Sequence, residues 1–109
     1  MGDKLRVPAR AVGFFAGSDA GIAILSGRVP DSDPDRAAAY KAIFDAPERA
    51  DGSRWVELTA DQLDALHESA EWFENAVSDS TWHPDGRADL HAARALLRGI
   101  NRLLAEHDE

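Results

Sequence analysis

Two stretches in the second half of the chain place apolar residues at alternating intervals of three and four. This spacing puts the side chains on one side of an α-helix. The positions are Leu63, Leu66, Ala70, Phe73 and Val77 in the first stretch and Leu90, Ala93, Leu97, Ile100, Leu104 and His107 in the second. Only the polar segment 78–86 separates them. Because short connections favour antiparallel neighbours, we expect a C-terminal antiparallel helical hairpin.

The start of the first hairpin helix carries an independent pattern. Thr59 and Gln62 have the spacing of a capping box, in which each side chain bonds the backbone amide of the other residue. Leu58 and Leu63 occupy the two positions of a hydrophobic staple around this cap. Cap, staple and apolar spacing together predict a helix over about 60–79, followed by a second helix over about 85–106.

Both apolar faces are wider than a two-helix contact requires. On the wheel, further apolar residues widen each face: Ala65, Trp72 and Ala76 on the first helix, and Ala92, Leu96 and Leu103 on the second. Either the N-terminal half or a second copy of the chain must cover this surface. We therefore expect a homodimer whose self-interface contains Leu97, Ile100 and Leu104.

The glycine-rich N-terminal half, residues 1–53, contains one clear helix pattern. Asp33 is placed to cap a helix and Pro34 to occupy its first turn, which predicts a helix near 34–45. Residues 9–29 support two alternatives. Gly13, Gly17 and Gly21 recur every four residues, as on a closely packed helix, whereas the neighbouring aromatic and β-branched residues favour a hairpin. The favoured interpretation is a pair of short elements punctuated by glycine.

The two halves are expected to be joined by a small sheet. Leu5–Val7 alternates in polarity, and residues 54–58 form a second short apolar and polar alternation. Pairing of these strands predicts a minor two-stranded β element beside the helices. The expected fold is therefore a single domain over 1–109, mainly α (or α+β), with the hairpin packed on a shorter helix.

Composition restricts the partners and the compartment. The 109 residues carry a net charge of −8, which opposes general binding to nucleic acid or to anionic membranes. The chain has no cysteine, which excludes disulfides and thiolate metal sites and suits a reducing cytoplasm. The apolar stretch 11–25 is short and interrupted by glycines, so we expect a cytoplasmic protein without a membrane segment.

One combination of residues could support metal-dependent or acid–base chemistry. His67 and Glu71 are spaced i, i+4, and His91 could approach them across the hairpin. The repeated Glu-x-x-His pairs of di-iron bundles and the Gly-x-Ser-x-Gly nucleophile elbow are both missing from the sequence. A small enzyme using these three residues is thus the alternative, and the main expectation is no cofactor, no metal and no catalytic residue.

The outward faces of the hairpin point to protein binding. The second helix carries an arginine stripe, and the connection before it contains Trp82, a residue type enriched at interfaces. The expected contact residues are Trp82, Arg94, Arg98 and Arg102. These features predict a small acidic protein–protein interaction module, acting as a homodimeric regulator, inhibitor or adaptor by occlusion or bridging. A structural subunit of a larger assembly is a further alternative.

Overall fold

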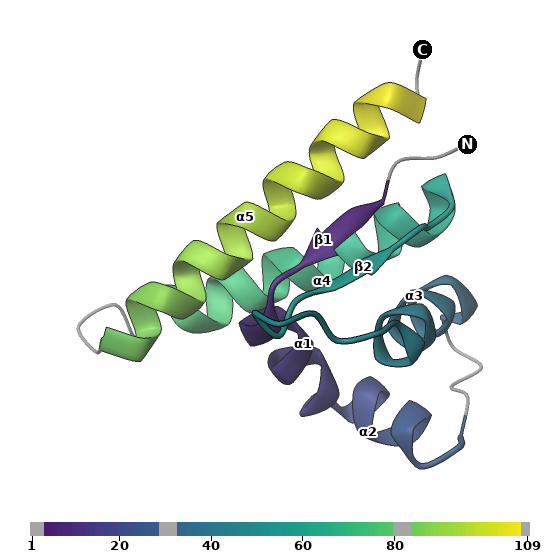
Figure 1. Ribbon diagram of the computed structural model, residues 1–109, viewed down its shortest axis with the longest axis horizontal. Coiled ribbons are helices and arrows are strands. Elements are labelled where there is room, and N and C mark those ends of the chain that lie inside the picture. The colour runs from purple at the N-terminus through teal and green to yellow at the C-terminus, as the bar shows by residue number, and fades with distance from the viewer. Residues whose placement is uncertain (1–3, 29–32, 80–83, 108–109) are drawn as a thin grey trace.

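The computed structural model describes residues 4–28, 33–79 and 84–107. Within these ranges the chain forms a two-stranded sheet and five helices (Figure 1). In chain order the elements are β1 (Leu5–Val7), α1 (Ala9–Ala16), α2 (Asp19–Leu25), α3 (Pro34–Asp45), β2 (Arg54–Val56), α4 (Ala60–Ser78) and α5 (Pro84–His107). The mainly α fold with a helical hairpin and a minor β element is confirmed.

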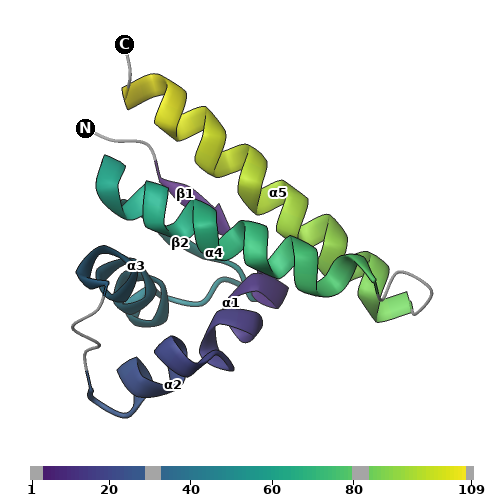
Figure 2. The ribbon, with the colours of Figure 1, turned by 180° about the vertical axis from the view of Figure 1, so that it is seen from behind.

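Helices α4 and α5 form the predicted antiparallel hairpin and make the most extensive helix–helix contact in the described chain. Seen from both sides, the small sheet lies along one face of this hairpin, and α1, α2 and α3 lie beside it (Figures 1 and 2). Four of the five buried residues of α4 are ones that the apolar spacing predicts: Leu63, Leu66, Ala70 and Phe73. The fifth is Ser69, and Val77, which the spacing also predicts, is partly buried. The first half of the hairpin therefore follows directly from its sequence pattern.

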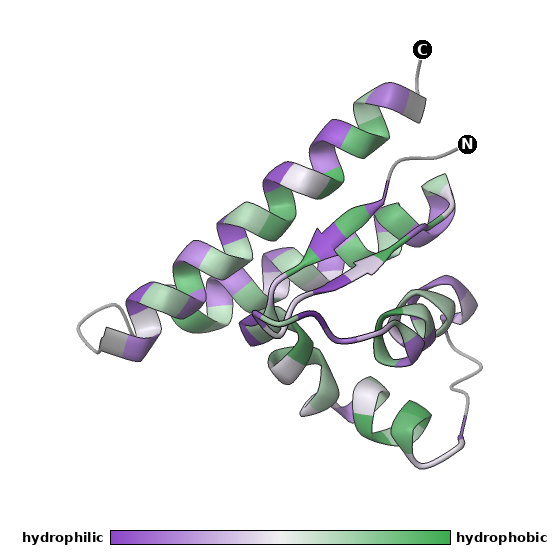
Figure 3. Cartoon of the chain, in the orientation of Figure 1, coloured by the Kyte–Doolittle hydropathy of each residue, from purple (hydrophilic) through white to green (hydrophobic). Residues whose placement is uncertain are grey.

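Hydrophilic and hydrophobic residues alternate along α5 (Figure 3), and the buried face of this helix is rotated from the predicted one. Leu96 and Leu103, expected at its flank, are buried, whereas Leu97 and Leu104 are only partly buried. The reason is the position of β1, which packs against α5. A Cβ added to Gly99 would lie 3.0 Å from Cδ1 of Leu5, so this strand approaches the helix backbone closely. The buried face of α5 thus packs against both α4 and the sheet, and the centre of this face shifts toward Leu96.

The N-terminal half covers the rest of the hairpin. Aromatic rings from α1, α3 and α4 meet in one cluster: the ring centroids of Phe15 and Tyr40 are 5.1 Å apart, and those of Phe14 and Phe73 are 4.4 Å apart. Both pairs are stacked. The sequence allowed either the N-terminal half or a second copy of the chain to cover the apolar surface of the hairpin. The N-terminal half covers a large part of it, and its residues form one core with the hairpin.

The two predicted strands pair with each other, and the pairing is antiparallel, with Leu5 opposite Val56 and Arg6 opposite Trp55. Leu5 and Val56 face the core, while Arg6 and Trp55 face outward. A turn before β2 supports the pairing, because Asp51 accepts hydrogen bonds from the side chain and the amide of Ser53 and pairs with Arg6 at 2.9 Å. The Ser53 hydrogen bonds and Arg6 hold the pKa of Asp51 far below its usual range.

The undecided segment 9–29 forms two short helices over its described part. Ser18 separates them: its hydroxyl accepts a hydrogen bond from the amide of Gly21 at 3.1 Å and donates one to the carbonyl of Phe15 at 2.6 Å. Gly21 then packs directly on the α1 backbone. A serine cap and a close helix–helix approach thus decide against a hairpin, despite the aromatic and β-branched residues.

Helix α3 begins as predicted. Asp33 accepts a hydrogen bond from the amide of Arg36 at 3.0 Å, and Pro34 occupies the first position. At the other end, Nη1 of Arg54 donates to the carbonyl oxygens of Phe44 at 2.8 Å and Ala46 at 3.0 Å. These bonds join the last turn of α3 to β2, and so fix the helix against the sheet.

The capping box of α4 is present with both of its bonds, at 3.2 Å from the Gln62 amide to the Thr59 hydroxyl and 3.1 Å from the Thr59 amide to the Gln62 side chain. Thr59→Ala should lower the free energy of unfolding by about 1 kcal/mol. The Gln62 amide loses its acceptor, and the bond from the Thr59 amide loses the reciprocal bond that orients the Gln62 side chain. Thr59→Ser keeps the hydroxyl and should remain close to the wild type. Urea unfolding of both variants checks this, and equal stability of the two would contradict it.

Candidate binding pocket

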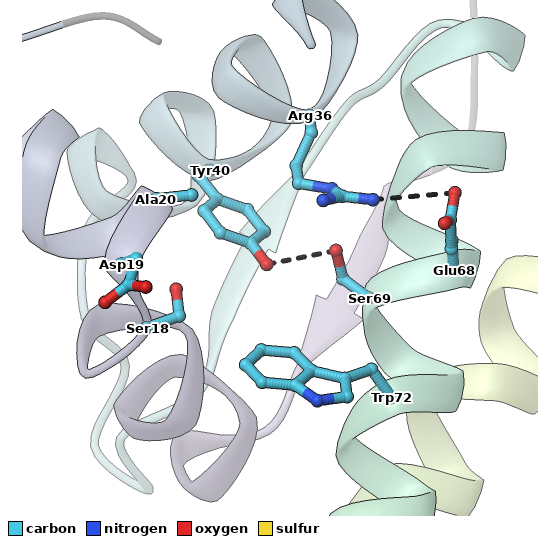
Figure 4. A pocket seen from close by; sticks show the side chains of 8 residues that line it. All are labelled: Ser18, Asp19, Ala20, Arg36, Tyr40, Glu68, Ser69 and Trp72. Carbon is cyan, nitrogen blue, oxygen red and sulfur yellow. Dashed lines mark hydrogen bonds and ion pairs between the residues drawn. The ribbon is translucent and has the colours of Figure 1, made fainter. Parts of the chain in front are cut away.

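The described part of the chain contains a pocket of about 650 Å³ between the start of α2, the first turns of α3 and the middle of α4 (Figure 4). Its size is typical of sites that bind small ligands or a protruding side chain. The lining residues are Ser18, Asp19 and Ala20 from the start of α2, Arg36 and Tyr40 from α3, and Glu68, Ser69 and Trp72 from α4. The pocket therefore joins three helices that are distant in the sequence.

Two hydroxyl groups form the inner part of the pocket. The Tyr40 hydroxyl donates a hydrogen bond to Oγ of Ser69 at 3.0 Å, and Ser69 in turn donates to the carbonyl of Ala65 at 3.4 Å. Burial raises the pKa of Tyr40, so its phenol stays protonated at neutral pH. The phenolic oxygen retains acceptor capacity for a ligand, because it donates its single proton to Ser69.

Trp72 forms an open wall of the pocket. Its side chain is 52% exposed, which makes it one of the most exposed large apolar residues in the described chain. The ring is nevertheless held in place, since Phe14 contacts it in an edge-on arrangement with centroids 4.8 Å apart, and Phe14 stacks on the buried Phe73. Trp72 is thus a supported aromatic surface in contact with solvent.

Charged groups line the opening. Nη2 of Arg36 lies 3.5 Å from Oε2 of Glu68, and Nε of Arg36 lies 3.6 Å from Oδ2 of Asp33. Asp19 lies across the pocket from Glu68, with Tyr40 between them (Figure 4). The lining therefore contains two carboxylates and one guanidinium, which is also paired with Asp33 outside the lining, so the opening has an excess of negative charge.

The lining residues offer binding groups rather than an activated nucleophile. The hydroxyl of Ser18 donates to the Phe15 carbonyl, and that of Ser69 donates to the Ala65 carbonyl, so each proton has a backbone acceptor. The described lining contains no histidine to act as a base toward these hydroxyls. Hydrogen bonding, ring stacking and charge are therefore the interactions that this pocket supplies.

The predicted metal or acid–base set does not come together. His67 and Glu71 are in contact, with Nδ1 of His67 3.0 Å from Oε1 of Glu71. The pairing of Arg94 with Glu74 fixes the register of the hairpin and places His91 roughly 15 Å from His67 along its axis, at 1.5 Å per residue. No group of three possible metal ligands occurs in the ranges that the structure describes.

Of the predicted contact residues, the three arginines lie on α5, which contributes no residue to the pocket lining. Nε of Arg94 pairs with Oε2 of Glu74 at 3.3 Å, whereas Arg98 and Arg102 are exposed and make no ion pair with described residues. Trp82 lies outside the described residues. Of the predicted self-interface residues, Ile100 is 0% exposed, and Leu97 and Leu104 are partly buried against the core.

The sequence prediction missed the pocket, although two features could have indicated it. Ser69 lies on the core side of α4, between Leu66 and Phe73, where a hydroxyl requires a polar partner. Tyr40 of α3 supplies that partner. Trp72 was expected at the edge of the core, and its half-exposed position agrees with that expectation.

Comparison of the chain with protein-family models, with curated proteins and with solved structures found no match in any of the three. Across residues 4–28, 33–79 and 84–107, no helix is both long enough and apolar enough to cross a membrane. The function must therefore be argued from the described surface and pocket.

Proposed function

We propose that this chain is a small protein–protein interaction module that binds its partner through the pocket between α2, α3 and α4. The observation that carries this proposal is Trp72, a half-exposed tryptophan supported by Phe14 at the wall of a cavity. Tryptophans at concave, well-supported positions are the residues that most often dominate binding energy at protein interfaces. A partner that covers this ring would remove it from water and fill the pocket.

Binding at this face suits a regulator, inhibitor or adaptor that acts in the cytoplasm by occlusion or bridging. The arginines of α5 offer a separate contact surface, since Arg98 and Arg102 are exposed and α5 contributes no residue to the pocket. Self-association remains part of the proposal in a narrower form. Because Ile100 is fully buried, a second copy would contact Leu97 and Leu104 instead.

The test compares two exposed tryptophans of the same chain. Trp72→Ala should reduce recovery of a co-purified partner from source cells at least about tenfold, as expected for the loss of an interface hot spot. Trp55, which is 37% exposed on the outer face of the sheet, supplies the matched control, and Trp55→Ala should retain the partner. Quantitative mass spectrometry of material captured on the tagged full-length chain measures both.

Circular dichroism must first show that both variants are folded. A partner lost with Trp72→Ala and kept with Trp55→Ala supports the proposal. Equal recovery with the two variants would place the interface elsewhere, and the arginine stripe of α5 would then be tested through Arg98→Glu. Failure to capture any stoichiometric partner with the wild type would contradict the interaction module itself.

A further inference from the structure

We infer that the pocket accepts the guanidinium of an arginine side chain presented by the partner, stacked on Trp72 and paired with Asp19 and Glu68. This inference rests on the proposed function and specifies the chemistry of the group that is bound. Three properties of the described pocket support it: the sign of the charge at its opening, the free aromatic surface and the arrangement of hydrogen-bond acceptors.

The charge at the opening favours a cation. Among the charged lining residues, Asp19 and Glu68 outnumber the single cation Arg36, and Arg36 is also paired with Asp33, which lies outside the lining. The contact between Arg36 and Glu68 is long, at 3.5 Å, so the Glu68 carboxylate keeps acceptor capacity for a ligand. Asp19 makes no ion pair with any described residue. An anionic ligand would meet this excess of negative charge, whereas an arginine would compensate it.

The aromatic wall favours a flat cation. A guanidinium stacks on a tryptophan when it lies within about 6 Å of the ring centroid. The same chain already contains this interaction on its sheet, where the guanidinium carbon of Arg49 lies 5.6 Å from the Trp55 ring centroid. Trp72 is more exposed than Trp55, and a ligand that reaches the pocket can contact it.

The acceptors are distributed as a guanidinium requires. Asp19 and Glu68 approach the pocket from opposite sides, and the Tyr40 hydroxyl lies between them (Figure 4). An arginine carries five N–H donors in a planar fork, so it can address acceptors on two sides while its plane lies on a ring. A lysine ammonium is a point donor on a flexible stem, and it would use this arrangement less fully.

The experiment uses the full-length protein and the peptide acetyl-Gly-Arg-Gly-amide. In ¹H–¹⁵N spectra, this peptide should shift the Trp72 indole signal and the backbone amides of residues 18–20 and 68–72, with saturation in the millimolar range. The matched peptide with citrulline, which is nearly isosteric but neutral, should bind at least tenfold more weakly. The lysine peptide should fall between the two.

Variants of the protein separate the charge and stacking contributions. Glu68→Gln, Asp19→Asn and Trp72→Leu should each weaken the arginine peptide about three- to tenfold. Asp64→Asn removes an equal charge from an exposed site of α4 outside the pocket and should change the affinity less than twofold. Trp55→Leu should leave the shifts at residues 68–72 unchanged.

Equal affinities for the arginine and citrulline peptides would overturn the inference, as would shifts confined to residues outside the pocket or the absence of shifts at 20 mM peptide. The partner capture with Trp72→Ala reports separately on the proposed function. A partner that depends on Trp72 without arginine binding would retain the interaction module and reject its cationic anchor. Arginine binding together with a partner that does not depend on Trp72 would retain the pocket chemistry and place the partner interface elsewhere.

Discussion

Gly21→Ala is expected to lower the free energy of unfolding by about 3 kcal/mol, because the new methyl group has no space. A Cβ at this position would lie 1.8 Å from the carbonyl oxygen and 2.8 Å from the carbonyl carbon of Phe15. Both atoms belong to the α1 backbone, which cannot move aside as the end of a side chain can. Urea unfolding followed by circular dichroism measures the loss.

Gly13→Ala is the matched control for this prediction. Gly13 lies inside α1, and a Cβ there would meet nothing within 4 Å. Alanine at this position should be neutral or stabilising by up to about 1 kcal/mol, because it restricts the unfolded chain and favours the helix. Similar stabilities of the two variants would contradict the close packing of α2 on α1.

Displacement of α2 has a second consequence. Asp19 and Ala20 precede Gly21 and form one side of the pocket, and the Ser18 cap bonds the Gly21 amide. Any shift that accommodates a methyl group at Gly21 therefore changes the width of the pocket. For this reason Gly21→Ala is a test of fold stability, and the binding experiments use substitutions at the lining side chains instead.

The helix boundaries could be predicted because their determinants are local. The Thr59–Gln62 capping box and the Asp33 cap with Pro34 each involve residues within three positions of one another, and the structure contains both. The pairing of β1 with β2 is not local. However, the two short stretches that alternate in polarity, Leu5–Val7 and residues 54–58, were the candidates for strands. Few alternatives were therefore available.

Local patterns could not predict which face of α5 is buried, nor could they predict the pocket. Apolar residues on α5 fall on two adjacent stripes, one with Leu97 and Leu104 and the other with Leu96 and Leu103, and periodicity alone does not rank them. The choice depends on β1, which lies more than 80 residues earlier in the sequence and packs at Gly99. The pocket likewise requires α2, α3 and α4 to meet, a property of the tertiary fold.

The buried face of α5 gives the second large expected effect. Ile100→Asp should abolish cooperative folding or lower the free energy of unfolding by more than about 4 kcal/mol, since it buries a carboxylate without a partner and removes a packed side chain. Ile100 is completely buried, within the core cluster. Leu97→Asp should cost only about 1–2 kcal/mol, because its partly buried position lets the carboxylate reach water.

The same pair of variants decides the proposed self-association. Thermal unfolding gives the stabilities, and sedimentation equilibrium gives the mass of each folded protein. If the wild type is a dimer and folded Leu97→Asp is a monomer, the partly buried edge of α5 forms the contact between copies. If the two have the same mass, Leu97 serves only the core. Equal loss of stability in Leu97→Asp and Ile100→Asp would instead show that Leu97 is buried as deeply as Ile100. The interior face of α5 would then be the predicted one with Leu97, and not the rotated one with Leu96.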